Sequence, residues 1–229
     1  MIKAVLFDMD GVIYDSLPSH VRAWSEMAQK YDLVLAPNDI YLWEGRIGSS
    51  IINKLYQATY GHDATQQEIN DLYAEKARLF SKYFNGQIIE GIRDVLENVK
   101  KLNLDMLIVT GSGQHGLIDK VTADFDGYFN RTKMITSFDV KVGKPHPEPY
   151  LTALRKAGVE ACEAIVVENA PLGVQSAVAA GIYTIAVNTG PLPDDMLFEA
   201  GADVLYHDMP SLANHIAHIV EYLNTPQDA

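Results

Sequence analysis

Residues 4–11 read Ala4-Val5-Leu6-Phe7-Asp8-Met9-Asp10-Gly11, and this stretch decides the fold. Its apolar run is typical of a short strand that is buried on both faces of a parallel sheet. Side chains alternate along a strand, so Asp8 and Asp10 point to the same side where the strand ends. Gly11 then allows a tight turn. The stretch therefore predicts a buried first strand over Ala4–Asp8 that brings two carboxylates to one edge of a sheet.

Later segments of the chain alternate between strand-like and helix-like patterns. Short runs rich in Val, Ile and Leu predict strands over Met106–Thr110, Ala164–Glu168, Thr184–Asn188 and Asp203–Tyr206. Apolar residues at three- and four-residue spacing predict helices over Gly91–Leu102, Pro147–Ala157, Leu172–Ala180 and Ser211–Leu223. This alternation predicts an α/β fold with a doubly wound parallel sheet. Ligands of such sheets bind beyond the carboxyl ends of the strands.

The stretch between residues 16 and 85 has a different character. It has no strand-like run, and it holds both tryptophans and six of the twelve tyrosines. Periodic segments predict helices over Val21–Tyr31, Ser50–Tyr60 and Gln66–Phe84. We therefore expect a helical cap domain over residues 16–85, inserted into an α/β core domain made of residues 1–15 and 86–229. Gln87–Gly91 returns the chain to the core and is the expected hinge of the cap.

Composition and charge exclude several classes of partner. The formal net charge of −12 opposes binding to nucleic acid and to anionic membrane surfaces. No apolar run approaches the roughly 18 residues of a membrane span, and Asp8 and Asp10 interrupt the N-terminal apolar stretch before it could act as a signal peptide. The single cysteine, Cys162, has no internal disulfide partner, and we expect a small buried side chain beside a strand. These features predict a cytoplasmic protein, which we expect to be a monomer.

The two aspartates at the end of the first strand suggest a metal site. Burying Asp8 and Asp10 together would raise one of the two pKa values sharply unless a cation lay beside them. Carboxylate oxygens are hard ligands that favour Mg²⁺. The alternative is a strand end whose aspartates only suit the turn that follows. The pair alone leaves both interpretations open.

Two other segments carry groups suited to a phosphoryl oxygen. Residues 109–113 read Val-Thr-Gly-Ser-Gly, and a hydroxyl followed by glycines forms a nest of donors, although a simple strand-to-helix turn has the same composition. Lys144 lies between Gly143 and Pro145, which restrict the backbone and direct the side chain to a fixed point. The alternative for Lys144 is an ordinary solvated lysine.

A third strand ends in Glu168 and Asn169. Pro171 suits the first position of a helix, which makes Ala170 the expected capping residue. Asn169 is then left to face a metal ion or to bond within the turn. Because the carboxyl ends of parallel strands share one edge of the sheet, all these groups are expected in one crevice. Carboxylates, hydroxyls, a lysine and oxygen ligands are the groups that phosphoryl transfer uses.

With these motifs the sequence resembles the haloacid dehalogenase-like (HAD) hydrolase superfamily along nearly its whole length. Residues 8–12, Asp-Met-Asp-Gly-Val, are similar to the first motif of that superfamily, and residues 110–111, Thr-Gly, to the second. Lys144 corresponds to the third motif, and Glu168 with Asn169 to the fourth. The helical insert resembles the cap of the β-phosphoglucomutase-like branch. The fourth motif usually ends in two acids, so Asn169 is a departure that implies weaker Mg²⁺ binding.

The resemblance implies a mechanism. Asp8 would attack phosphorus and form an aspartyl-phosphate, and Asp10 would be the general acid and base. Mg²⁺ would be held by Asp8, the Asp10 main-chain carbonyl and Asn169, while Glu168 would bind the metal or orient a bound water. The groups that would neutralise the phosphoryl oxygens are Thr110, Gly111, Ser112 and Lys144.

The cap loop, residues 42–48, reads Leu-Trp-Glu-Gly-Arg-Ile-Gly and bears on the substrate. Glu44 and Gly48 stand where the mutase-like pattern has a lysine and an arginine, whereas His20 is retained, and Arg46 could compensate as a cation. Together with residues 109–114 and 168–173, the loop resembles an inorganic pyrophosphatase of this branch. That resemblance implies hydrolysis of inorganic pyrophosphate with Glu44 at the substrate, although Glu44 could instead be a solvated residue at a helix end.

Two alternatives remain open. The first is a sugar-phosphate phosphatase or a β-phosphoglucomutase-type phosphomutase with the same catalytic aspartates. The second, from another class, is a phosphorylation module similar to a response-regulator receiver, which also combines an acidic cluster, Mg²⁺, a hydroxyl and a lysine. Receivers are roughly half as long, have no helical cap and place the phosphorylated aspartate in a later strand.

Overall fold

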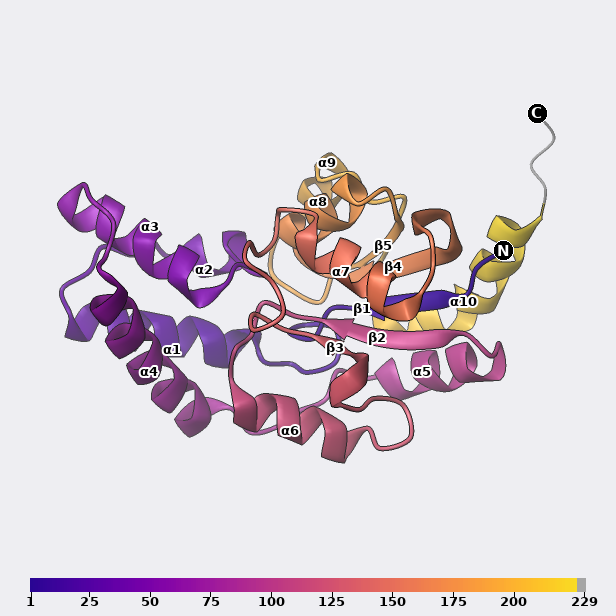
Figure 1. Cartoon of the computed structure of the whole chain (residues 1–229), viewed down its shortest axis with the longest axis horizontal. Coiled ribbons are helices and arrows are strands. Elements are labelled where there is room, and N and C mark those ends of the chain that lie inside the picture. The colour runs from indigo at the N-terminus through magenta and orange to yellow at the C-terminus, as the bar shows by residue number, and fades with distance from the viewer. Residues whose placement is uncertain (226–229) are drawn as a thin grey trace.

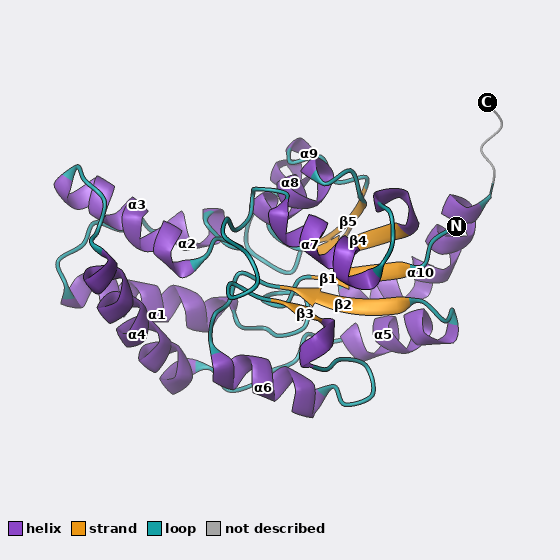
Figure 2. Cartoon of the chain, viewed as in Figure 1, coloured by secondary structure: helices purple, strands orange, loops and turns teal. Residues whose placement is uncertain are grey.

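A parallel sheet forms the centre of the molecule (Figure 2). The structure is a computed structural model that describes residues 1–225. Within these residues six strands lie in the order β3-β2-β1-β4-β5-β6, and all neighbouring pairs are parallel. Their bounds are β1 Ala4–Phe7, β2 Asp105–Val109, β3 Met134–Ile135, β4 Ala164–Glu168, β5 Tyr183–Val187 and β6 Val204–Tyr206. The strand order confirms the predicted doubly wound α/β fold.

Helices cover both faces of the sheet. Val5 and Phe7 point to the face covered by α5 (Ile92–Lys101), α6 (His115–Asp124) and α10 (Met209–Asn224). Ala4 and Leu6 point to the opposite face, where α7 (Glu148–Ala157) and α8 (Pro171–Ala179) pack and α9 (Asp194–Glu199) follows. Alternate residues of β1 are thus buried in two separate apolar layers, which explains why the whole strand reads as apolar.

Four helices inserted after β1 pack at the end of the molecule that lies far from the N-terminus (Figure 1). They are α1 (Leu17–Lys30), α2 (Asp39–Leu42), α3 (Gly48–Tyr60) and α4 (Gln66–Tyr83). A capping box formed by Thr65 and Glu68 starts α4. The inserted helical cap of the predicted fold is therefore confirmed, while its domain boundaries after residues 15 and 85 stay a prediction.

Two chain segments run side by side where the cap meets the core. An antiparallel bridge pairs Tyr14 with Ile88, and the Asp15 amide donates to the Gln87 carbonyl over 2.9 Å. The buried Tyr14 donates its hydroxyl to Asp124 Oδ2 over 2.8 Å and so ties this junction to α6. A paired two-segment connection is where a cap can pivot, and the predicted hinge at Gln87–Gly91 lies here.

Some expectations fail for local reasons. Cys162 is exposed and not buried, because it lies in the short 3₁₀ turn Ala161–Glu163 that precedes β4 and not beside a strand. The strand β3 has two residues, too few for a recognisable apolar run. The helices α2, α6 and α9 were not predicted either, and α2 and α9 have only four and six residues. Among the described residues no helix has the length and apolar character needed to cross a membrane.

Two glycines with positive φ differ in their packing, and their substitution tests the contact between α5 and α10. Gly91 (φ 85°) precedes α5, and a Cβ there would lie 2.6 Å from the backbone nitrogen of Pro210 at the start of α10. Gly158 (φ 69°) follows α7, and a Cβ there would meet nothing within 4 Å. We expect Gly158→Ala to cost about 1–2 kcal/mol from backbone strain alone. Gly91→Ala should cost about 1–3 kcal/mol more, because the α5–α10 contact must also shift. Urea unfolding measures both, and equal losses would contradict this packing.

Candidate active site

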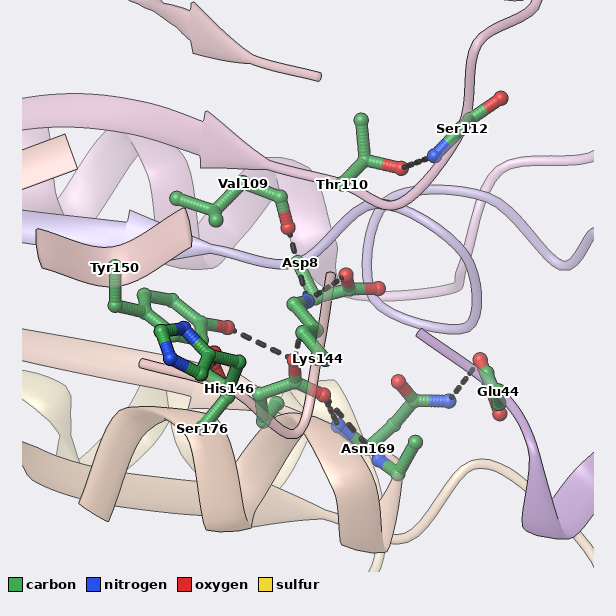
Figure 3. A network of polar contacts seen from close by, with 12 residues as sticks. Asp8, Glu44, Val109, Thr110, Ser112, Lys144, His146, Tyr150, Asn169 and Ser176 are labelled. Carbon is green, nitrogen blue, oxygen red and sulfur yellow. Dashed lines mark hydrogen bonds and ion pairs between the residues drawn. The ribbon is translucent and has the colours of Figure 1, made fainter. Parts of the chain in front are cut away.

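A buried lysine joins three strand ends at the carboxyl edge of the sheet (Figure 3). Lys144 Nζ lies 2.5 Å from Asp8 Oδ1, 2.6 Å from Glu168 Oε1 and 3.0 Å from the Val109 carbonyl oxygen. Only 1% of its side chain is exposed. Burial favours the neutral amine, but the carboxylates of Asp8 and Glu168 raise the pKa of Lys144 above its ordinary value. Lys144 is therefore a fixed cation beside the predicted nucleophile.

Glu168 serves as the second anchor of that lysine. Its Oε1 accepts from Lys144 Nζ and from the Tyr150 hydroxyl over 2.8 Å, and its Oε2 accepts from the amides of Asn169 and Ala170. Gly173, in the first turn of α8, leaves the space for this carboxylate, since a Cβ there would overlap it. Both oxygens of Glu168 are thus engaged by protein donors.

The carboxyl of Asp8 is buried in a group of acids. Burial is the largest of the influences that raise the pKa of Asp8 to about 8; Lys144 opposes the shift, and Glu168 and Asp10 add to it. A further cation beside Asp8 would favour its ionised form. The electrostatics of the site therefore leave room for a metal ion in addition to Lys144.

Asn169 offers an oxygen for such an ion. Its Nδ2 donates to Glu44 Oε1 of the cap over 3.2 Å, while its Oδ1 is buried without a hydrogen-bond partner (Figure 3). Gly11 (φ 84°) makes room for this side chain, because a Cβ there would lie 2.0 Å from Asn169 Nδ2. Within residues 1–225 no group of three His, Cys, Asp or Glu side chains could hold a metal ion. A cation here would depend on the side-chain oxygen of Asn169 and on the Asp10 main-chain carbonyl as well as on Asp8.

Asp10 is held by a chain of hydrogen bonds that reaches into the cap. The Ser16 hydroxyl donates to Asp10 Oδ1 over 2.5 Å, and His20 Nε2 lies 3.0 Å from the same oxygen. Lys76 Nζ, on α4, lies 2.7 Å from His20 Nδ1. Burial and the neighbouring Lys76 lower the pKa of His20, so the imidazole is neutral, accepts from Lys76 and donates to Asp10.

Lys76 is a cavity residue that the motifs do not reveal, although its position in the sequence carries a signal. Lys76 follows Leu72 by four residues and precedes Leu79 and Phe80 by three and four, so it stands on the apolar stripe of α4. It is 2% exposed, and burial lowers its pKa to about 7. A lysine at a core position of an amphipathic helix is costly to bury, which marks it as a candidate functional residue.

The loop after β2 packs directly against the cap. The Ser112 amide donates to Thr110 Oγ1 over 3.0 Å, and the Gly113 amide donates to the hydroxyl of Tyr73 on α4 over 3.1 Å. A Cβ on Gly111 would lie 2.6 Å from the Gly45 carbonyl oxygen of the cap. Only glycine at this position permits such an approach, so the cap is closed on the core.

A cavity is enclosed between the cap and the core. Of the predicted site residues, Asp8, Asp10, Glu44, Gly111 and Ser112 line it. The other predicted residues do not line the cavity but are bonded to residues that do. Lys144 is bonded to Asp8, Asn169 to Glu44 and Thr110 to Ser112. Glu168 is connected through Lys144. Lining residues that were not predicted as site residues include Trp43, Arg46, Tyr73, Lys76 and Gln114.

A family model described as haloacid dehalogenase-like hydrolase matches residues 5–187, from β1 to β5. The chain belongs to this family. Hexitol phosphatase A of Escherichia coli is 31% identical over 216 residues, which cover 92% of this chain and 93% of that protein. The β-phosphoglucomutase of Bacillus subtilis is 27% identical, with 95% and 94% covered.

A solved structure with the same fold bears a related name. A putative β-phosphoglucomutase from Bacteroides vulgatus superposes with a TM-score of 0.93 and is 46% identical, covering 98% of this chain and 91% of that one. The family membership and this structural similarity confirm the resemblance seen in the motifs at residues 8–12, 110–111, 144 and 168–169 of this HAD-like hydrolase.

The central lysine should be required for stability. Lys144→Met would leave Asp8 and Glu168 buried side by side without their cation, which typically costs about 3–5 kcal/mol. Lys141→Met, three residues earlier and exposed, should change the free energy of unfolding by less than about 0.5 kcal/mol. Urea unfolding at neutral pH compares the two variants. Equal losses in the free energy of unfolding would mean that Lys144 does not compensate the negative charge of Asp8 and Glu168.

The buried cap lysine should give stability a specific pH dependence. Because the pKa of Lys76 falls from 10.5 to about 7 on folding, the unfolded chain binds the extra proton between those values, and the free energy of unfolding rises with pH in that window. Lys76→Met removes this contribution. The stability of Lys76→Met relative to wild type should therefore fall by at least about 1 kcal/mol between pH 7 and 9.5.

Lys82→Met, an exposed lysine of the same helix, provides the control for Lys76. Its stability relative to wild type should stay level between pH 7 and 9.5. If the stability of Lys76→Met relative to wild type were also constant between pH 7 and 9.5, Lys76 would not be buried as a neutral amine.

Proposed function

We propose that the chain is a Mg²⁺-dependent phosphatase that acts through a phosphorylated Asp8. The observation that carries this proposal is the presence of Asp8 and Asp10 together on the wall of one cavity. Asp8 is bonded to a buried cation, and Asp10 is held separately by Ser16 and His20. One carboxylate is thus available to an electrophile, while the other is positioned to move a proton.

The proposed reaction has two steps. An Asp8 oxygen attacks phosphorus, the bond from phosphorus to the leaving oxygen breaks, and Asp10 gives its proton to that oxygen. Water then attacks the aspartyl-phosphate, its proton passes to Asp10, and Asp8 and phosphate are released.

Asp10 needs a proton before the first step. Burial favours its neutral form, but His20 and Ser16 lower the pKa of Asp10 below its ordinary value. A phosphate dianion bound beside it raises that pKa again by like-charge repulsion. A bound substrate therefore favours the protonated form of Asp10, which its own leaving group requires.

The donor set fits Mg²⁺. Asp8, the Asp10 main-chain carbonyl and Asn169 would hold the ion, and the unpartnered Asn169 Oδ1 supports this assignment. When bound, Mg²⁺ neutralises charge on the transferring phosphoryl group. Glu168 acts through Lys144, because both of its oxygens already accept hydrogen bonds. Thr110, Gly111 and Ser112, with Lys144, would receive the phosphoryl oxygens.

We propose phosphorylated sugars or sugar alcohols as the substrate class. The names of the relatives support this alternative and favour it over the inorganic pyrophosphate expected from the sequence. Hydrolysis is favoured over a mutase reaction because Glu44 and Gly48 occupy the places where the mutase-like pattern has cations. A Cβ on Gly48 would lie 2.2 Å from the ring of Tyr73, so this cap has no room for an arginine there.

Inorganic pyrophosphate is the second candidate, and the tight closure of the cap favours it. The main chain of Gly45 lies against Gly111, and a Cβ on Gly143 would lie 2.8 Å from the Ile47 side chain. These close approaches enclose a small cavity around Asp8 and Asp10. A leaving group as compact as phosphate would fit such a space.

A phosphate-release panel tests the function. With Mg²⁺ present, hexitol and hexose phosphates and inorganic pyrophosphate are compared, and conversion of glucose 1-phosphate is followed in parallel. We expect phosphate release without isomerisation. Asp8→Asn should abolish release, and Asp10→Asn should lower kcat by about 10²–10⁴. Asp126→Asn, an exposed turn residue, is the matched control.

Several outcomes would contradict the proposal. Full activity of Asp8→Asn would exclude the phosphorylated-aspartate mechanism, and activity that survives chelation of divalent ions would exclude the metal. A phosphorylated Asp8 that persists for minutes without phosphate release would favour the receiver-like alternative. Faster turnover of pyrophosphate than of every sugar phosphate would make pyrophosphate the substrate.

A further inference from the structure

Every N–H donor of the ammonium group of Lys144 is already bonded to the protein. An ammonium group carries three N–H donors. These reach Asp8 Oδ1, Glu168 Oε1 and the Val109 carbonyl oxygen. Under the proposed function the same ammonium group receives a phosphoryl oxygen. Lys144 must therefore give up one of its three contacts when a phosphoryl group arrives beside Asp8.

Glu168 is the acceptor that keeps a donor when Lys144 moves. Its Oε1 accepts from Lys144 Nζ over 2.6 Å and also from the Tyr150 hydroxyl over 2.8 Å (Figure 3). Only 1% of Glu168 is exposed, so this oxygen is shielded from bulk water. A buried carboxylate oxygen that loses its last donor carries a large penalty. The Tyr150 hydroxyl therefore lowers the cost of moving Lys144 from Glu168 to a phosphoryl oxygen.

The hydroxyl of Tyr150 is not needed to fill the space that the side chain occupies. Tyr150 lies in the first turn of α7 and is fully buried in the apolar layer that contains Leu6 and Val109, where a phenylalanine ring would pack as well. The centroid of its ring lies 5.1 Å from Lys144 Nζ, close enough for cation–π attraction. The ring thus flanks the lysine, while the hydroxyl bonds to the partner of that lysine.

We propose that Tyr150 is a positioning residue that holds Glu168 while Lys144 turns to the phosphoryl group of the substrate. The proposal rests on the proposed function and adds to its site a residue that touches neither the substrate nor a metal ion. Lys144 exchanges Glu168 Oε1 for a phosphoryl oxygen when the substrate binds and returns to it when phosphate leaves. Because this exchange belongs to binding, the hydroxyl of Tyr150 favours the bound states and leaves the chemical step unchanged.

The experiment removes the hydroxyl and keeps the ring. With saturating Mg²⁺, kcat and KM for phosphate release are measured on the phosphate compound that the wild type turns over fastest, and inorganic phosphate serves as an inhibitor that reports binding without chemistry. The variants are Tyr150→Phe and Tyr150→4-aminophenylalanine, whose N–H is a weaker donor than a phenol. Tyr128→Phe is the matched control, because the Tyr128 hydroxyl donates to Glu97 Oε2 over the same 2.8 Å and neither residue lines the cavity.

Tyr150→Phe should raise KM and the inhibition constant of inorganic phosphate together. Both should rise by about 10- to 100-fold, the size of a lost hydrogen bond to a charged group, while kcat changes by less than about 3-fold. Tyr150→4-aminophenylalanine should raise both constants by about 2- to 10-fold. Tyr128→Phe should match the wild type in all three quantities. A merely structural role of Tyr150 would lower the thermal stability without this paired rise.

Unchanged values of KM and of the inhibition constant in Tyr150→Phe would overturn the proposal, whether or not kcat falls. If Tyr150→Phe fails to fold, Tyr150→4-aminophenylalanine decides by the same two constants. Failure of the proposed function looks different, because the wild type would then release no phosphate from any substrate or would keep its activity in Asp8→Asn. The positioning role of Tyr150 would then fall with it.

Discussion

The ammonium group of Lys144 stands between the carboxylates of Asp8 and Glu168, and the arrangement of the active site depends on this contact. Two buried acids so close together would repel each other and would take up a proton, since burial penalises the charged form. The cation opposes that repulsion and at the same time ties together the ends of β1, β2 and β4. The sheet brings these ends to one edge, but the lysine keeps Asp8 beside a positive charge. The structure and the proposed reactivity therefore depend on the same ion pairs.

Closure of the cap completes the surroundings of Asp10, the proposed acid–base group. Asp10 belongs to the core, yet the residues that orient it are Ser16, just before α1, and His20 on α1, with Lys76 of α4 behind His20. Removing the cap would leave Asp10 without His20 and would open the cavity to water. Glycines at the junction allow the two backbones to touch, as the contact between Gly111 and the Gly45 carbonyl shows. The proposed nucleophile is therefore positioned by the core, whereas the contacts of the proposed acid–base group depend on the closed cap.

The sequence is most informative where chemistry and local structure coincide. The buried strand that ends in two aspartates predicts both β1 and the cavity wall, because alternation along a strand and the position of the strand end are local properties. Lys76 escapes prediction because its place in the site depends on a contact between segments far apart in the chain: it meets His20 across 56 residues. The strand β3 escapes because two residues carry no periodicity, and its pairing with β2 is decided by the rest of the sheet. Motifs indicate the chemistry to expect at the site, but only the packed cap shows which of its residues line the cavity.

Two departures from the family pattern explain each other. The fourth motif ends in Asn169 where the superfamily pattern usually has an acid, and the cap carries Glu44 where the mutase-like pattern has a lysine. In the closed form Asn169 Nδ2 donates to Glu44 Oε1 over 3.2 Å. A second carboxylate at residue 169 would repel Glu44 at this distance, in a region where burial already raises the pKa of Glu44 well above its ordinary value. The amide instead offers a donor to the cap and keeps an oxygen for a cation, so one side chain serves both contacts. A cap lysine would pair equally well with an acid at residue 169. In this chain an amide at residue 169 is therefore better suited than an acid to the acidic cap residue Glu44.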